Sequence, residues 1–187
     1  FGYFFLKMME GSLDDYALDN ILTKAVVTQQ DLKRDYYQGN SFDIGDFDAN
    51  IGSMLMKAPA AINAALFRPF ILEANNLVML LSSLENLVIL LFTIKVLFKS
   101  RVFGFFKIVF ANHLLTFAFI FSIFFAFSVG ISTSNFGSLV RYKIPVIPFY
   151  IACLYIVQYK VDLGREERKK LKFEVNEQTK GITLISA

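Results

Sequence analysis

The sequence has very few of the residues on which most catalytic and metal sites depend. It contains one cysteine and one histidine, and the cysteine, Cys153, lies inside an apolar run. A single thiol cannot build a disulfide framework or a cysteine-based metal site within the chain, and a lone histidine cannot form a haem-binding pair. Sequence patterns of serine hydrolases, zinc peptidases, P-loops and dinucleotide-binding loops are missing as well. The sequence therefore predicts no cofactor and no metal, and it leaves open whether the protein is an enzyme.

The chain also has little net charge, with a formal value of +3 over 187 residues. Such a small charge gives no indication of a nucleic-acid partner. By contrast, 55% of the residues are hydrophobic, 22 are phenylalanine and the mean hydropathy is +0.50. That composition is too apolar for a typical soluble domain. An all-α, polytopic membrane protein embedded in a lipid bilayer is the predicted class.

Three apolar runs predict three transmembrane helices. Residues 77–98 would form about 33 Å of helix, which matches a hydrocarbon core of about 30 Å. Residues 108–131 form a longer, phenylalanine-rich second run, and residues 144–159 a shorter third one of about 24 Å. Pro145 and Pro148 fall in the first turn of the third run, where proline is tolerated. Because this run is short, a re-entrant segment is the alternative for it.

The positions of the basic residues predict the orientation of these helices. Basic residues gather between the first two runs and again after the third, in residues 160–170. Those near the first connection are Lys95, Lys99, Arg101 and Lys107. Cytoplasmic loops carry an excess of Lys and Arg, so both segments are expected in the cytoplasm, with residues 160–187 as a basic cytoplasmic tail. Three spans satisfy both expectations, and they place residues 10–76 and 132–143 outside the cytoplasm.

The region before the first span is expected to be extracytoplasmic and to carry short helices. Apolar residues at helical spacing in residues 18–26 predict one amphipathic helix. Residues 52–67 predict a second, kinked one, because Lys57, Pro59 and Asn63 interrupt its apolar face. We expect this second helix on the membrane surface, with packing against the rest of the polar region as the alternative. Residues 1–9 resemble the tail of a preceding membrane helix.

Four charged residues are predicted to meet where residues 10–76 and 132–143 reach the membrane. They are Arg68, Glu73, Arg141 and Lys143. Arginine binds phosphate bidentately, so a cationic rim above an apolar groove suits a phosphorylated lipid head, for example that of a lipid-linked saccharide. The alternative is that these cations only anchor the spans at the headgroups.

Polar residues inside the predicted spans are the second candidate group. Glu85 lies about 12 Å below the outer end of the first span, where an ionisable group is costly and is expected to face protein. It is predicted to be either a hydrogen-bonded structural carboxyl or a functional acid. Ser82, Asn86 and Thr93 extend a polar stripe from Glu85 along nearby faces of the helix. His113, in the second span, lies too far from the level of Glu85 for a direct pair, and an interhelical hydrogen bond is the simpler role for it.

One acidic pattern is predicted to have no metal. Asp46, Asp48 and Asn50 alternate as at the start of a calcium loop. Lys57, however, stands where such a loop requires a bidentate glutamate. We therefore do not expect a calcium ion there.

Four stretches, "FDIGDFDANIGSML", "ALFRPFILEANN", "SSLENL" and "NFGSLVRYKIPVIPF", resemble in their order the C-terminal half of a group of uncharacterised bacterial inner-membrane proteins associated with cell-envelope polysaccharide genes. The resemblance covers roughly residues 40–155. It implies a multi-pass protein of the bacterial plasma membrane. The positions that it singles out are Arg68, Glu73, Glu85, Asn135 and Arg141.

Three functions are compatible with these features. The first is a non-catalytic membrane subunit or accessory of an envelope complex, which would bind other membrane helices. The second is a fragment of a polysaccharide polymerase or another lipid-linked glycosyl-transferring enzyme, suggested by the cationic rim. The third is a transporter or proton-path component, suggested by Glu85. No catalytic acid or base can be identified in the sequence.

Overall fold

The protein is an all-helical bundle in a computed structural model that describes residues 18–32 and 41–185. Within these residues the only β-type pairing is a single bridge between Ser41 and Asn135. The helices are α2 (Leu18–Leu32), α3 (Ile51–Met56), α4 (Ala58–Phe67), the short 3-10 helix η3 (Ile71–Glu73), α5 (Leu77–Ser100), α6 (Val102–Phe110), α7 (His113–Ser132), α8 (Phe136–Tyr142) and α9 (Val146–Ile185). The predicted segment 1–9 lies outside the described residues.

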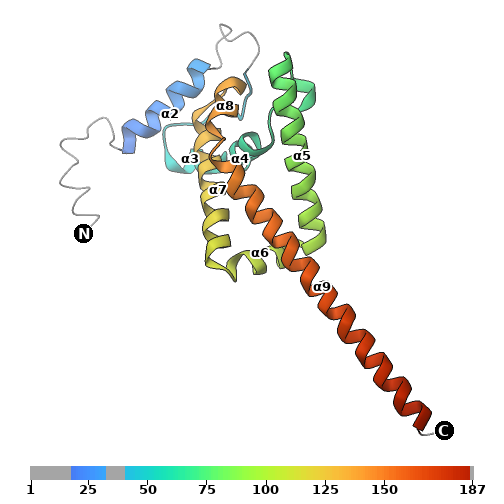
Figure 1. The fold of residues 1–187 in the computed structure, drawn as a ribbon. Helices are drawn as coiled ribbons and strands as arrows, with labels where there is room; N and C mark the ends of the chain where they lie inside the picture. The colour runs from blue at the N-terminus through green and yellow to red at the C-terminus, as the bar shows by residue number, and fades with distance from the viewer. Residues whose placement is uncertain (1–17, 33–40, 186–187) are drawn as a thin grey trace.

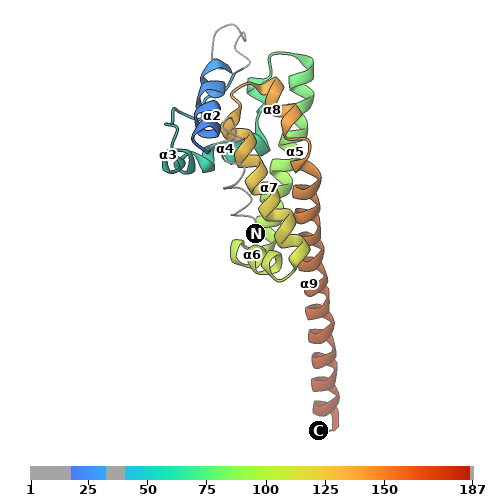
Figure 2. The ribbon, with the colours of Figure 1, turned by 90° about the vertical axis from the view of Figure 1, so that its left-hand side faces the viewer.

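Three of these helices, α5, α7 and α9, are long and apolar enough to span a membrane, as predicted. Helix α9 packs against both α5 and α7, and α6 crosses one end of the bundle (Figures 1 and 2). We call this the α6 end and the opposite one, where α2, α4 and α8 lie, the α8 end. Part of the polar stripe of α5 is used for helix packing, because the hydroxyl oxygens of Thr93 and Tyr150 lie 3.1 Å apart in the core.

The second and third spans differ in their limits from the predicted ones. Residues 108–110 belong to α6, and α7 begins only at His113. The third span continues without a break into the basic tail, as one helix of 40 residues, about 60 Å long at the helical rise. A re-entrant segment would have to turn back within the bilayer, so that alternative is wrong. The predicted boundary at residue 160 does not correspond to any change in the backbone.

Asparagines set the start of four helices. Asn50, Asn76, Asn112 and Asn135 stand at the N-caps of α3, α5, α7 and α8. In each case the side-chain oxygen accepts a backbone N–H of the first turn, for example from Met79 at 2.8 Å and from Gly137 at 2.8 Å. Such caps satisfy backbone donors that the helix itself leaves unpaired. Asn135, which the resemblance singled out, is thus a capping residue.

The region before α5 packs onto the spans. Helix α2 contacts α7, and α4 packs against α7 and α5. The predicted interruption at Lys57 is confirmed, since α3 ends before it and α4 begins after it. Helix α4 buries a face of mainly small residues against α7 and α5, and its position relative to the membrane surface stays a prediction. A Cβ added to Gly130 of α7 would stand 2.1 Å from the carbonyl oxygen of Ala61, so this close helix contact requires glycine.

Residues 41–47, which precede α3, pack against α8 and the residues just before it. The backbone N–H of Phe42 donates to the carbonyl of Ser134 at 2.8 Å, and the rings of Phe42 and Phe136 lie 5.2 Å apart. Gly45 turns the chain with a φ of 84°, where its N–H donates to the Asp43 carboxyl at 2.7 Å. A side chain at this φ would be strained. Phe42 and the loop that carries Arg68 are thereby brought together.

Candidate functional site

Arg68 and Glu73 form a multiply hydrogen-bonded ion pair at the α8 end. Arg68 ends α4, and its Nε lies 3.0 and 3.2 Å from the two carboxyl oxygens of Glu73, while Nη2 donates to Oε1 as well. Glu73 also accepts the N–H of Phe70 at 2.8 Å. Burial alone would raise the pKa of Glu73, but these hydrogen bonds and the Arg68 charge outweigh it and lower the pKa. The pair fixes the loop between α4 and α5.

Three phenylalanine rings surround the guanidinium of Arg68. Its central carbon lies 5.2 Å from the ring centre of Phe42, 5.9 Å from that of Phe70 and 5.6 Å from that of Phe136. Cations are attracted to aromatic faces at this distance. Glu73 therefore occupies the edge of the guanidinium formed by Nε and Nη2, and the side chain of Arg68 is only 23% exposed.

Lys143 is buried and joins two segments. Its side chain is 5% exposed, and Nζ donates to the carbonyl of Arg68 at 3.1 Å and to Oδ1 of Asn86 at 2.5 Å. Asn86 in turn donates from Nδ2 to the carbonyl of Pro69 at 3.3 Å. Burial lowers the pKa of Lys143 to about 8, although the nearby charge of Glu85 acts in the opposite direction. Lys143 therefore fastens the start of α9 to the α4–α5 loop and to α5.

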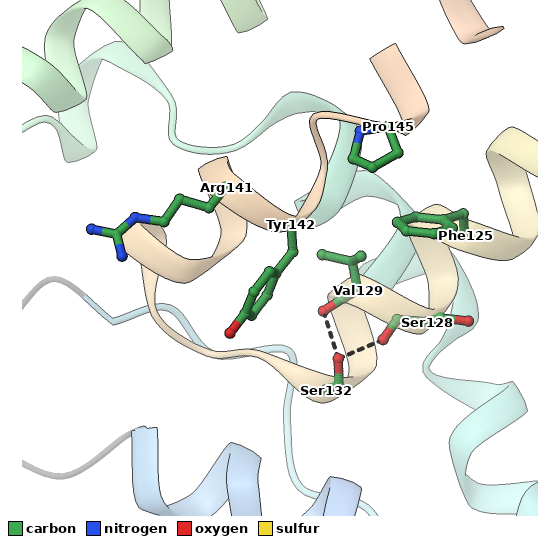
Figure 3. A pocket seen from close by; sticks show the side chains of 7 residues that line it. All are labelled: Phe125, Ser128, Val129, Ser132, Arg141, Tyr142 and Pro145. Carbon is green, nitrogen blue, oxygen red and sulfur yellow. Dashed lines mark hydrogen bonds between the residues drawn. The ribbon is translucent and has the colours of Figure 1, made fainter. Parts of the chain in front are cut away.

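Arg141 lies apart from this group. It is exposed and contributes to the wall of a shallow cavity of about 370 Å³. Figure 3 shows its guanidinium directed away from the other lining side chains, which include Tyr142 and Ser132. The hydroxyl of Ser132 donates a hydrogen bond to the backbone carbonyl of Ser128 at 2.7 Å. Arg68, Glu73 and Lys143 do not line this cavity.

The structure thus brings together three of the four residues of the predicted rim and separates the fourth. Arg68, Glu73 and Lys143 form one connected group with Asn86, which we call the Lys143 joint. Its charged atoms are engaged by carbonyls, by a carboxylate and by an amide. Chemically the joint can hold three segments in fixed geometry. The position of Arg141 at an open groove fits an anchoring cation.

Glu85 and Asn86 have opposite surroundings although they are adjacent. Asn86 is 2% exposed, whereas Glu85 is exposed. The buried face of α5 follows Ser82, Asn86 and Ile89, and at 3.6 residues per turn Glu85 falls about 60° to the side of Ser82. Among the residues that the structure describes, Glu85 therefore lies on an exposed side of α5, and its contact with protein stays a prediction. Its neighbours on the helix surface are exposed leucines and valines.

His113 differs from the prediction in its location. It is the first residue of α7 and is exposed at the helix end, so it does not lie inside the second span. The difference arises because Asn112 starts a new helix, accepting N–H groups from Leu114 and Leu115 at 3.0 and 3.2 Å. Within residues 18–32 and 41–185, the side chain of His113 forms no hydrogen bond with a neighbouring helix.

The acidic pattern before α3 has a structural role. Asn50 accepts the N–H of Ser53 at 2.7 Å, and the Ser53 hydroxyl accepts the N–H of Asp48 at 3.1 Å. Across residues 18–32 and 41–185, no three His, Cys, Asp or Glu side chains gather closely enough to hold a metal ion. The pattern builds the N-terminal turn of α3.

Sequence reasoning did not anticipate the rings around Arg68 or the burial of Lys143. Phe42 and Phe136 belong to segments far apart in the chain, which the bridge between Ser41 and Asn135 brings together. A lysine two residues before a proline at the start of a span is usually interpreted as exposed. The available signal was Asn86, a buried amide that requires hydrogen-bonding partners.

Comparisons of the chain with protein families, with curated proteins and with solved structures found no match.

Proposed function

We propose that this protein is a non-catalytic membrane subunit of a bacterial cell-envelope complex and that it binds other membrane helices through the exposed face of α5. The proposal rests on the exposure of Glu85 within a candidate membrane span. Its carboxyl lies in the third turn of a candidate membrane span, on a surface that no other part of the described residues 18–32 and 41–185 covers.

The surroundings of Glu85 favour a protein neighbour over lipid. Leu81 and Val88, one turn before and after it, are 57% and 66% exposed. A carboxyl facing hydrocarbon costs about 2.5 to 3.5 kcal/mol even on the lenient insertion scale. A partner helix that offers a hydrogen-bond donor removes this cost, because interhelical hydrogen bonds and apolar packing drive association in membranes.

A non-catalytic role is supported by the use of charge at the α8 end. Arg68 is paired with Glu73, and Lys143 is buried against Arg68 and Asn86. A glycosyl-transferring enzyme, the second candidate, would need these cations open toward a phosphorylated lipid. A transporter or proton path, the third, would need Glu85 to face a water-filled passage.

The proposed orientation places the α6 end in the cytoplasm. The two basic segments lie at this same end, because Lys99 pairs with Asp162 at 2.5 Å and Arg165 donates to the carbonyl of Lys99 at 2.8 Å. Lys and Arg in short loops favour the cytoplasmic side. The assignment to a bacterial envelope complex rests on the sequence resemblance described above.

Site-specific photocrosslinking in the native membrane tests the proposal. A photoreactive residue replaces Val88 on the Glu85 face of α5, and Phe124, which is 67% exposed on α7, serves as the matched control position. We expect a protein crosslink from position 88 that persists in Glu85→Gln and falls several-fold in Glu85→Leu, because glutamine keeps hydrogen-bonding groups and leucine does not. Lipid adducts alone at position 88, or an unchanged protein crosslink in Glu85→Leu, would overturn the proposal.

A further inference from the structure

A cationic cavity of about 500 Å³ lies at the α6 end, between α5, α6 and α9. Six basic side chains from three segments line it, and these are Lys99, Arg101, Lys107, Lys160, Arg165 and Arg168. Basic residues beside a membrane span are ordinary. Their convergence on one cavity from separate helices is a further feature that orientation alone does not require.

Three of the six cations have structural partners. Lys99 is paired with Asp162, Arg165 donates to the carbonyl of Lys99 at the end of α5, and Arg168 donates to the carbonyl of Gly164 at 2.9 Å. Cations at a helix C-terminus stabilise its exposed carbonyls. These contacts explain why the three residues are where they are.

The side chains of the other three, Arg101, Lys107 and Lys160, form no ion pair or hydrogen bond with any residue that the structure describes. Among the described residues, Asp162 is the one carboxylate that forms an ion pair with a cation of this cavity. The cavity therefore has a large excess of positive charge. Such an excess attracts anions, and a headgroup with two phosphates would balance more of it than a headgroup with one.

Arg101 stands where its backbone is strained. It links α5 to α6 with a φ of 58° and a ψ of 147°, a region that side chains rarely adopt and that costs about 1 to 3 kcal/mol. Glycine would relieve this strain, yet the position holds an arginine that lines the cavity. Backbone strain of this kind clusters at functional sites, including ligand clamps.

Helix α6 provides an apolar surface beside the cations. Phe103 is 90% exposed and Phe110 58% exposed, while Phe105 and Val109 face the bundle. The helix lies across the ends of the spans (Figures 1 and 2). An amphipathic helix with exposed rings in this position is suited to the boundary between headgroups and acyl chains. The apolar residues that line the cavity itself are Ile108 of α6 and Val161 of α9.

We propose that this cavity binds the headgroup of an anionic phospholipid, with preference for one that carries two phosphates. Guanidinium groups bind phosphate oxygens in pairs, and basic pockets between membrane helices hold anionic headgroups. Arg101, Lys107 and Lys160 are the cations that contact the phosphates. The inference rests on the span assignment and is independent of the role proposed for Glu85.

Gly104 makes a sharp test possible. It lines the cavity, and a Cβ added there would meet nothing within 4 Å. Gly104→Glu therefore adds a carboxylate beside the cations without a clash, and Gly104→Gln is the matched neutral control. The measurement is lipid retention by the purified full chain in native mass spectrometry. The probes are diphosphatidylglycerol, phosphatidylglycerol and phosphatidylcholine, each with and without millimolar inorganic phosphate.

We expect retention in the order diphosphatidylglycerol, phosphatidylglycerol, phosphatidylcholine, with diphosphatidylglycerol about tenfold weaker on Gly104→Glu and unchanged on Gly104→Gln. Equal retention of the three lipids, or equal retention by the two variants, would overturn the proposal. Displacement of the lipid by inorganic phosphate would identify a free phosphate site and overturn the headgroup assignment.

Arg101→Gly separates binding from folding. The substitution removes one cation and relieves the backbone at the same time, so the melting temperature should not fall, while retention of diphosphatidylglycerol should drop about fivefold. A lower melting temperature together with unchanged retention would show that Arg101 is purely structural, and would remove it from the proposed site.

Discussion

The two ends of the bundle hold basic residues in contrasting ways. At the α8 end Arg68 and Lys143 are engaged by Glu73, Asn86 and backbone carbonyls, and Lys143 is buried. At the α6 end, cations such as Arg101 and Lys107 line an open cavity. The sequence pattern made the first group the candidate ligand site. The two ends therefore differ in how far their cations are already engaged by protein groups, and on this difference the proposed anion site is assigned to the α6 end.

The largest expected effect is on the free energy of unfolding, and it should differ between a glycine at the α8 end, Gly130, and one at the α6 end, Gly104. At Gly130 any side chain would collide with the backbone of Ala61, so Gly130→Leu should lower the free energy of unfolding by more than about 3 kcal/mol. At Gly104 the space is open, and Gly104→Leu should change it by no more than about 1 kcal/mol, in the favourable direction. Thermal unfolding of the detergent-solubilised proteins measures both. Equal losses would contradict the close contact between α4 and α7.

A pH titration distinguishes the buried lysine from the exposed ones. The pKa of Lys143 is lowered from 10.5 to about 8, so above pH 8 the unfolded chain binds more protons than the folded one. Stability should therefore rise as the pH increases from about 8 to about 10.5, by roughly 2 kcal/mol between pH 8 and 10. The neutral amine keeps N–H donors for Asn86 and for the Arg68 carbonyl.

Two lysine variants test the origin of that rise. Lys143→Met should abolish it, because methionine does not titrate, whereas Lys160→Met at the α6 end should leave it unchanged. Unfolding curves recorded across this pH range give the comparison. A rise that survives in Lys143→Met would mean that another group is responsible, and the burial of Lys143 would lose its proposed energetic consequence.

Much of this architecture can be predicted from the sequence, because long apolar runs, and polar residues that interrupt them, are visible within a short stretch of the chain. The three spans and the interruption at Lys57 are of this kind. The start of α7 was missed because α6 is as apolar as the span that follows, although Asn112 is a typical N-cap residue. Lys143 was predicted at the surface because its partner Asn86 lies 57 residues away. Burial that depends on such distant pairing leaves no local pattern.

A smaller effect is expected when Arg68 is replaced by lysine. The ammonium keeps the charge but loses the multiple contacts with Glu73 and the planar contact with the Phe42 and Phe136 rings. The side chains of Arg68 and Glu73 are only 23% and 22% exposed, so we expect a loss of about 1 to 2 kcal/mol in the free energy of unfolding. Chemical denaturation measures it, with Glu73→Gln as the companion variant. No loss in either variant would show that the pair contributes nothing to the joint.

The smallest effect is expected at Arg141, and it completes the comparison within the α8 end. Its guanidinium is exposed beside a shallow cavity and is directed away from it (Figure 3). Anchoring at headgroups needs only a flexible cation, so Arg141→Lys should change the free energy of unfolding by less than about 0.5 kcal/mol. If Arg141 instead held a phosphate bidentately, lysine would weaken retention of anionic lipid in native mass spectrometry, because the planar two-pronged contact would be lost. Equal lipid retention by Arg141→Lys and the unmodified protein, together with the loss expected for Gly104→Glu, would place anion binding at the α6 end alone.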